Sequence, residues 1–239
     1  VYFHRLHPRI SRNSFLCVMN TNIIFKTADP THWRAISDLY TVTYAKHEPM
    51  SFHLGHMENS ICFPEFAKIL LPRGSSHVAL LGSTGELVGF EINEVIEPNE
   101  DTVYYNVNND NLKKETAECQ QTIQKVDKYL TELSSAFYAE YRSQRKFYNA
   151  FAAVDPKFSK QGIHKEFIRL GEAQAALTRC QIVFAEATSL FSQKNYASMD
   201  YIEYGCLLYE DFRFEGKRVF PAIIDGKHKG AKLYYKILS

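Results

Sequence analysis

The sequence of 239 residues predicts one α/β domain built around a mixed sheet. Short apolar runs rich in β-branched and aromatic residues alternate with segments in which apolar residues recur every three or four positions, and this alternation is typical of strands covered by helices. Hydrophobic residues make up 45% of the chain and charged residues 23%, which is enough apolar material to offset the entropy lost on folding. The sequence shows no internal repeat, low-complexity tract or clear linker that would divide it further.

Residues 1–21 differ from the rest of the chain. Arg5, Arg9 and Arg12 lie in this segment, which contains no acidic residue and lacks the apolar core of roughly 7–15 residues that a signal peptide requires. We therefore predict that residues 1–21 are a disordered or non-native extension and that residues 22–239 form the domain. A mitochondrial transit peptide is the alternative interpretation of the arginines and serines.

The first half of this domain predicts three strands and two helices. Three β-rich runs bounded by turn residues predict strands at Ile23–Thr27, His77–Leu81 and Leu87–Ile96. A helix is predicted over His32–Ala45, because its apolar residues fall on one face. Proline biases the residue before it away from the α conformation, so His47–Met50 breaks this helix, and a second helix is predicted over Phe63–Leu70.

The second half predicts a long helix followed by alternating strands and helices. Residues 108–144 are mostly polar and contain no proline or glycine, and apolar residues recur there at three- and four-residue steps, which predicts an amphipathic helix. Its apolar face consists of Ile123, Val126, Leu130, Leu133 and Phe137. The remaining predicted elements are strands at Phe147–Val154, Gln181–Glu186, Gly205–Phe212 and Lys232–Leu238 and helices at Gly162–Arg179 and Phe191–Tyr201.

Charge, hydropathy and cysteine content limit the partners and the compartment. The 28 Lys and Arg residues against 27 Asp and Glu give a net charge of +1, which provides no overall field for a nucleic acid. No apolar run approaches the ~20 residues that cross a bilayer. The 5 cysteines are widely spaced without a Cys-x-x-Cys pair, and the 9 histidines show no ligand-like spacing. We expect a cytoplasmic monomer or weak dimer with a small-molecule partner and without a metal, nucleic acid or membrane span.

The segment Ala153–His164 joins a predicted buried strand to a helix through a short polar loop. Free backbone N–H groups and the helix macrodipole favour an anion such as a pyrophosphate at the N-terminus of a helix. Lys157 and Lys160 add positive charge to this loop. An ordinary strand-to-helix connection has the same appearance, so this segment alone leaves both interpretations open.

Several segments along the chain carry a resemblance to a known family. They are Glu48–Ser51, Val154–Ile163, the Ala-Thr-Ser-Leu-Phe-Ser-Gln-Lys run Ala187–Lys194, Tyr209–Phe212, Val219–Pro221 and His228–Lys236. In their order and spacing they resemble the GNAT superfamily of N-acyltransferases, in its arylalkylamine N-acetyltransferase-like branch. The resemblance implies the GNAT fold, a single domain with a central mixed, mostly antiparallel twisted sheet flanked by helices, here with a long helical insertion.

This resemblance also implies an activity. A protein of this branch is an acetyl-CoA-dependent N-acyltransferase that moves an acetyl group to a small primary amine, here an arylalkylamine-like one, by direct transfer in a ternary complex. Longer acyl-CoA donors fit the same family. The implied CoA-binding residues are Ala153, Val154, Ser159, Lys160, Gln161, Gly162, Ile163, His164 and Ser192.

The phosphate loop departs from the family's pattern, which reads Arg/Gln-Gly-x-Gly-x-Gly/Ala. Ser159 stands at the first position, Lys160 replaces the first glycine and His164 replaces the last small residue, while Gly162 is kept. An imidazole adds bulk where the backbone approaches a phosphate, yet a protonated one donates a hydrogen bond to it; a ring that points away is the other interpretation. These departures motivate an alternative function, a GNAT-fold binding protein with weakened or lost CoA binding and no catalysis.

Acyl transfer to an amine needs a group that accepts the ammonium proton and groups that stabilise the oxyanion. Glu48 falls at the position of the family's catalytic glutamate, which implies that it is the base; a solvated loop carboxylate is the alternative. Thr188 and Ser192 fall where the family has polar residues lining the site. Tyr196 lies one helical turn beyond Ser192 and is implied as the acid for the CoA thiolate. Packing of Tyr196, and capping of the following helix by Thr188 or Ser189, are the other interpretations.

Overall fold

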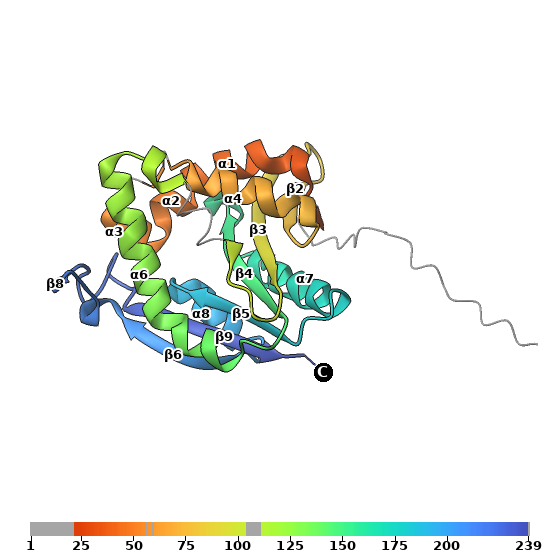
Figure 1. Cartoon of the computed structure of the whole chain (residues 1–239). Helices are drawn as coiled ribbons and strands as arrows, with labels where there is room; N and C mark the ends of the chain where they lie inside the picture. The colour runs from red at the N-terminus through yellow and green to blue at the C-terminus, as the bar shows by residue number, and fades with distance from the viewer. Residues whose placement is uncertain (1–21, 56, 59, 104–110, 239) are drawn as a thin grey trace, which may run out of the picture.

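A computed structural model describes residues 22–55, 57–58, 60–103 and 111–238 (Figure 1). Its centre is a seven-stranded sheet with the strand order β1-β2-β3-β4-β5-β9-β6. These strands are β1 (Ile23–Thr27), β2 (His77–Leu81), β3 (Leu87–Ile96), β4 (Lys146–Val154), β5 (Ile182–Ala187), β9 (Gly230–Ile237) and β6 (Ile202–Leu208). The prediction for residues 1–21 lies outside the described residues.

Every neighbouring pair in this sheet is antiparallel except β4 and β5. These two parallel strands are paired only from Lys146 with Ile182 to Tyr148 with Phe184. Beyond this point β4 continues to Val154 along β3, and β5 continues to Ala187 along β9, so the two strands part. Backbone groups on a strand edge that leaves its ladder inside a protein need another partner. The parting of β4 and β5 therefore marks a place where an extended ligand can pair with backbone.

Helices cover both faces of the sheet (Figure 1). They include α1 (Trp33–Val42), α4 (Cys62–Leu70), α6 (Ala117–Glu140), α7 (Ile163–Leu177) and α8 (Leu190–Ala197). Val78 and Ala79 are adjacent on β2 and point to opposite faces; Val78 packs with α1 and α4, and Ala79 packs with α7. On β5, Phe184 packs against α6, while Val183 packs against α7. One face is thus covered by α1, α4 and α6 and the other by α7.

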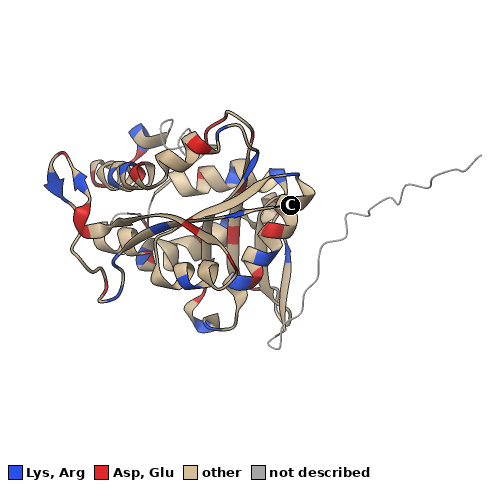
Figure 2. Ribbon diagram, turned by 90° about the horizontal axis from the view of Figure 1, so that it is seen from below, with Lys and Arg blue, Asp and Glu red and all other residues tan. Residues whose placement is uncertain are grey.

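Charged residues of both signs are distributed over the described part of the chain. Figure 2 shows Lys and Arg interspersed with Asp and Glu along the ribbon. Within the part of the chain that the structure describes, no helix combines the length and the apolar character needed to cross a bilayer.

The N-terminal half confirms the three predicted strands and corrects the first helix. The predicted helix His32–Ala45 ends at Val42, because the Thr43 backbone (φ −118°, ψ −75°) is distorted from ideal helix values and its hydroxyl donates to the Leu39 carbonyl. The helices α2 (Tyr44–His47) and α3 (Pro49–Leu54) follow. The predicted break is present, since the backbone is extended at the residue between them, but proline begins α3 at the first helical position, where it is favoured.

The C-terminal half corrects one predicted strand. The strand expected at Gly205–Phe212 is β6, which spans Ile202–Leu208, and it is followed by a short hairpin of β7 (Arg213–Phe214) and β8 (Lys217–Arg218). Tyr209 and Phe212 are fully buried and pack with Phe220. Burial of these rings in the cluster beneath α6 directs the chain away from the sheet edge after Leu208.

The predicted long helix is present as α6, but it begins at Ala117 and ends at Glu140, within the predicted range 108–144. Tyr129 joins it to the sheet. The Tyr129 hydroxyl donates to the Leu207 carbonyl of β6 and accepts from the Ala231 N–H of β9 at 3.0 Å, and the side chain is fully buried. Burial raises the pKa of this hydroxyl, so it stays protonated and able to donate.

Removing this hydroxyl should destabilise the fold. We expect Tyr129→Phe to lower the free energy of unfolding by about 1–3 kcal/mol, because two backbone groups lose a partner inside the protein. Tyr204→Phe is the control, since it removes an exposed bond to Glu140 and should change the free energy by less than about 0.5 kcal/mol. Urea denaturation of both variants measures the difference, and equal midpoints would contradict the role of Tyr129.

Candidate active site

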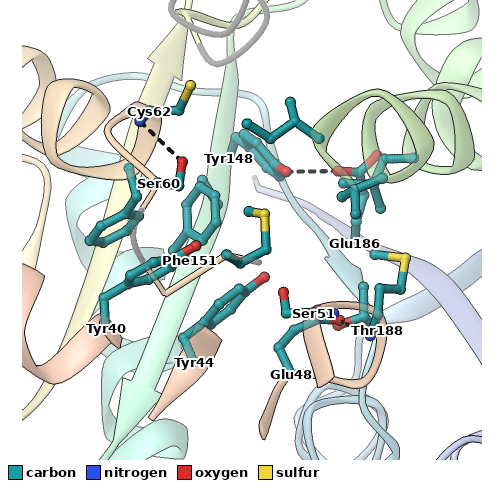
Figure 3. Close-up of a pocket in the computed structure, with 17 residues that line it drawn as sticks. Tyr40, Tyr44, Glu48, Ser51, Ser60, Cys62, Tyr148, Phe151, Glu186 and Thr188 are labelled. Atoms are coloured by element: carbon teal, nitrogen blue, oxygen red, sulfur yellow. Dashed lines mark hydrogen bonds between the residues drawn. The ribbon is translucent and has the colours of Figure 1, made fainter. Parts of the chain in front are cut away.

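A pocket lies on the face covered by α1, α4 and α6, where β4 and β5 part (Figure 3). Its cavity volume is about 40 Å³, it opens to solvent, and it is lined by α1 to α4, α6 and the parted strands. One wall is aromatic: the rings of Tyr40 and Phe63 stack 3.8 Å apart, and those of Tyr44 and Phe151 meet at 5.3 Å. Such rings bind the faces of apolar or aromatic groups. The pocket also holds two carboxylates, Glu48 and Glu186.

A β-bulge shapes β4 beside the pocket. Asn149 lies opposite Asn93 on β3 and Phe151 lies opposite Ile92, so the intervening Ala150 has no partner in this ladder. A bulge of this kind leaves one residue unpaired and bends its strand. Ala150 lines the pocket, and its backbone therefore offers hydrogen-bonding groups at the point where β5 has already turned away.

Glu48 is both a pocket residue and the cap of α3. Its Oε1 accepts from the Met50 N–H at 3.1 Å and its Oε2 from the Ser51 N–H at 2.7 Å. These bonds satisfy two N–H groups that have no partner within the helix, and they hold the carboxylate in one orientation. The side chain is buried rather than solvated, so the interpretation as an exposed loop carboxylate does not apply. Glu48 can present a fixed negative charge to a cation in the pocket.

Glu186 enters the pocket from β5 and was not a predicted site residue. The Tyr148 hydroxyl of β4 donates to its Oε2 at 2.7 Å (Figure 3). Burial raises the pKa of Glu186 to about 7, against the hydrogen bond from Tyr148 and the nearby Ser134 hydroxyl, which lower it. The available sequence signal is a single carboxylate in an otherwise apolar strand, and such a residue is rarely buried without a reason.

The other three predicted catalytic residues are distributed over the end of β5 and α8. Thr188 lines the pocket. Ser189 caps α8, and the Ser192 hydroxyl, half-buried one turn later, donates to the Ser189 carbonyl at 2.9 Å. Tyr196 is buried, and its oxygen accepts from the Asn149 amide at 3.2 Å, while burial raises the pKa of its hydroxyl. The structure thus brings Glu48 and Thr188 together in the pocket, and Ser192 and Tyr196 are not among the residues that line it.

The predicted phosphate loop follows β4 and leads into α7. Ala153 and Val154 end the strand, and Lys160 and Gly162 both adopt the left-handed conformation, with φ of 62° and 80°. This conformation is easy for glycine and costs a lysine some energy. The first bond of α7 joins the Glu166 N–H to the Gly162 carbonyl, so the preceding N–H groups of the first turn lack an intrahelical partner. Such a loop can hold an anion at the helix N-terminus.

His164 on the first turn of α7 is turned toward α8. Its Nδ1 lies 2.8 Å from the Asn195 amide nitrogen, and its ring meets the Tyr196 ring edge-on at 5.8 Å. Burial lowers the pKa of His164 below its ordinary value of 6.5, so the ring is neutral at pH 7. The structure supports the interpretation of a ring that points away from the loop. Positive charge at this loop comes from the exposed Lys157 and Lys160 instead.

Solved structures share this architecture. Arylalkylamine N-acetyltransferase 2 from Aedes aegypti has a TM-score of 0.78 and 20% identity, covering 91% of this chain and all of that one. The polyamine N-acetyltransferase of Drosophila melanogaster, which forms N-acetylagmatine, has a TM-score of 0.74 and 17% identity, covering 90% and 100%. The NatC complex, bound to a Gag peptide and CoA, has a TM-score of 0.54 and 12% identity, covering 91% and 99%. The chain has the GNAT fold. No family model and no curated protein matches the sequence.

The GNAT fold confirms the predicted fold class, including a mostly antiparallel sheet with helices on both faces. Among the described residues, no group of three or more His, Cys, Asp and Glu side chains lies together as a metal site would require. The roles of the predicted site residues stay predictions.

Proposed function

We propose that this GNAT-fold protein is an acetyl-CoA-dependent N-acetyltransferase that acetylates a small primary amine by direct transfer in a ternary complex. The parting of β4 and β5 beside a pocket that holds two carboxylates carries this proposal. The gap offers an unpaired strand edge to an extended co-substrate, and the pocket offers carboxylates to an amine. The solved structures with this fold support it, since they include enzymes named for acetylation of arylalkylamines and polyamines.

The CoA part of the proposal follows β4 from the bulge to the phosphate loop. The pantetheine arm of acetyl-CoA carries two amides that can pair with the free edge of β4. Its pyrophosphate would meet the N–H groups of the loop and of the first turn of α7. The residues proposed for this contact are Ala153, Val154, Ser159, Lys160, Gln161, Gly162, Ile163, His164 and Ser192, with His164 contributing its backbone.

The amine part of the proposal rests on the lining of the pocket. Tyr40, Tyr44, Phe63 and Phe151 form an aromatic wall, and the carboxylate of Glu48 lies in the same pocket. An arylalkylamine combines an aromatic ring with an ammonium group, so it matches both features. Glu48 would attract the ammonium and Thr188 would orient it or a water. Ser192 would shuttle a proton or orient water, and Tyr196 would donate a proton to the leaving thiolate.

Titration with CoA tests this function directly. A ligand that binds only the native state raises the unfolding midpoint, so we expect CoA and acetyl-CoA to raise the Tm with saturation at micromolar concentration. Release of free thiol from acetyl-CoA in the presence of tyramine, tryptamine, agmatine or spermidine then reports acetylation. No Tm shift at millimolar CoA and no thiol release would overturn the proposal and favour the binding protein without CoA.

Gly162 should decide the strength of CoA binding. We expect Gly162→Val to weaken CoA binding at least about tenfold, because a β-branched residue is strained at this positive φ and distorts the loop. Gly74→Val is the matched control: Gly74 also has a positive φ and open space around it, but it precedes β2, far along the chain from the loop. CoA affinity that falls equally in both variants would mean that strain alone explains the loss.

The remaining statements about this protein stay predictions from the sequence. They are a cytoplasmic location, a monomeric or weakly dimeric state, and the absence of nucleic-acid and membrane partners. The scattered cysteines and the near-neutral charge support them.

A further inference from the structure

The two carboxylates of the pocket differ in how their oxygen atoms are occupied. Both oxygens of Glu48 accept backbone N–H bonds from α3. Glu186 receives one bond, from Tyr148 to Oε2, while its Oε1 is shielded from solvent and has no partner among the described residues. A buried acceptor without a donor is costly and needs an explanation. Glu186 is therefore the pocket carboxylate with an oxygen left for a ligand.

A hydroxyl that lies close to Glu186 donates its proton to another group. Ser134 on α6 faces Glu186, but its single hydroxyl proton is donated to the Leu130 carbonyl at 2.8 Å. The two carboxylates also share surroundings: the pKa of Tyr44 is raised by burial and then by the charges of Glu48 and Glu186. A cation beside Tyr44 thus lies within the field of both carboxylates.

We propose that Glu186 is the catalytic residue that accepts the proton of the substrate ammonium, at Oε1, while Glu48 attracts and orients that ammonium. This inference rests on the proposed acetyltransferase function. Tyr148 acts as a positioning residue, because its hydrogen bond fixes Oε2 and leaves Oε1 without a donor. The geometry divides two tasks that the sequence resemblance assigns to Glu48 alone.

The proposed step is balanced in protons and electrons. The ammonium R–NH₃⁺ transfers one proton to Glu186 Oε1, and the freed lone pair of R–NH₂ forms a C–N bond with the thioester carbonyl carbon of acetyl-CoA. The carbonyl electron pair moves to oxygen and returns as the C–S bond breaks, so that the thiolate leaves with the bonding pair. The second nitrogen proton ends on the thiolate sulfur. Glu186 then releases its proton to water, giving N-acetylamine, CoA-SH and H⁺ overall.

The groups around Glu186 suit a base that works near neutral pH. Burial raises the pKa of its carboxyl to about 7, the negative charge of Asp127 on α6 raises it further, and Tyr148 and Ser134 lower it. Tyr44 and Glu48 face the same pocket from α2 and α3. A base is most effective when its pKa lies near the operating pH. Glu186 meets this condition and has the vacant oxygen that proton transfer requires.

The pH dependence of catalysis tests the inference. The variants Glu186→Gln, Glu186→Asp, Tyr148→Phe and Glu48→Gln would be compared between pH 5.5 and 9, with the best amine of the panel above and with thiol release as the readout. Wild-type kcat/KM should rise with pH along an ascending limb of the pH–rate profile, with its midpoint near pH 7. Glu186→Gln should lower kcat/KM by about 10²- to 10⁴-fold and remove the limb, with an unchanged Tm shift by CoA. Glu186→Asp should keep the limb at a lower rate.

The variants Tyr148→Phe and Glu48→Gln test the residues that position Glu186 and the ammonium. Tyr148→Phe should move the limb to higher pH, because the lost hydrogen bond is one that lowers the pKa of Glu186. Glu48→Gln should reduce the rate but leave the limb in place. Wild-type activity that persists in Glu186→Gln with the same limb would overturn this inference and leave the acetyltransferase function standing. A wild-type protein that neither binds CoA nor releases thiol would instead overturn the function.

Discussion

Replacing Glu48 by alanine should lower kcat/KM for the amine by about 10²- to 10³-fold with CoA affinity kept within about twofold. The carboxylate lines the same pocket as Tyr44, and both of its oxygens are fixed by the backbone of α3. A charge held in this way costs no reorganisation when a cation binds. Alanine removes that charge, and water in its place stabilises the ammonium less well. Steady-state kinetics with CoA titration of each variant measures both quantities.

The experiment must separate the loss of the Glu48 charge from the loss of the N-cap of α3. Glu48→Ala also removes the N-cap of α3, which costs about 1 kcal/mol of stability. Glu48→Gln keeps a side-chain oxygen for capping but loses the charge, so it should be as slow as Glu48→Ala while unfolding closer to wild type. Glu48→Gln with wild-type kcat/KM would show that Glu48 serves only the helix and would remove it from the mechanism.

Much of the fold follows from local patterns, and its corrections come from tertiary contacts. The strands β1, β2 and β3 have the predicted bounds because each is a β-rich run between turn residues. The prediction omits the helix Pro49–Leu54 because proline predicts a break there, although it also favours the first helical position. The end of β6 at Leu208 depends on the burial of Tyr209 and Phe212 beneath α6, a contact between segments far apart in the sequence.

The sequence motifs predict part of the candidate site, but they do not predict the contacts and roles of its buried residues. Glu48 and Thr188 meet in one pocket, as the resemblance implies, since both flank elements with recognisable ends. Tyr196 shares a helix face with Ser192 in the sequence pattern, but only packing of α8 against β4 shows that its hydroxyl meets Asn149. Sequence motifs do not predict Glu186, because its role depends on the parting of two strands. Strand pairing is a non-local property.

Glu186 should also leave a signature in stability that needs no substrate. A carboxyl whose pKa is 4.5 unfolded and about 7 folded binds more protons in the native state over this range, so the free energy of unfolding falls as pH rises from about 4.5 to 7. Below this window Glu186 is protonated in both states, and above it the full cost of the buried charge applies. That cost is about 3 kcal/mol at pH 8. The Glu186→Gln variant has no titrating group at this position, so it does not bear the cost of the buried charge.

We therefore expect the stability of Glu186→Gln relative to wild type to grow by up to about 3 kcal/mol between pH 5 and pH 8 in guanidinium denaturation. Glu132→Gln, at an exposed position of α6, is the matched control and should follow wild type at both pH values. A relative stability that is constant with pH would show that the carboxylate is solvated in solution and would weaken its case as a base. A variant that gains stability as it loses activity is expected of a buried charge kept for catalysis, because packing alone would favour the neutral amide.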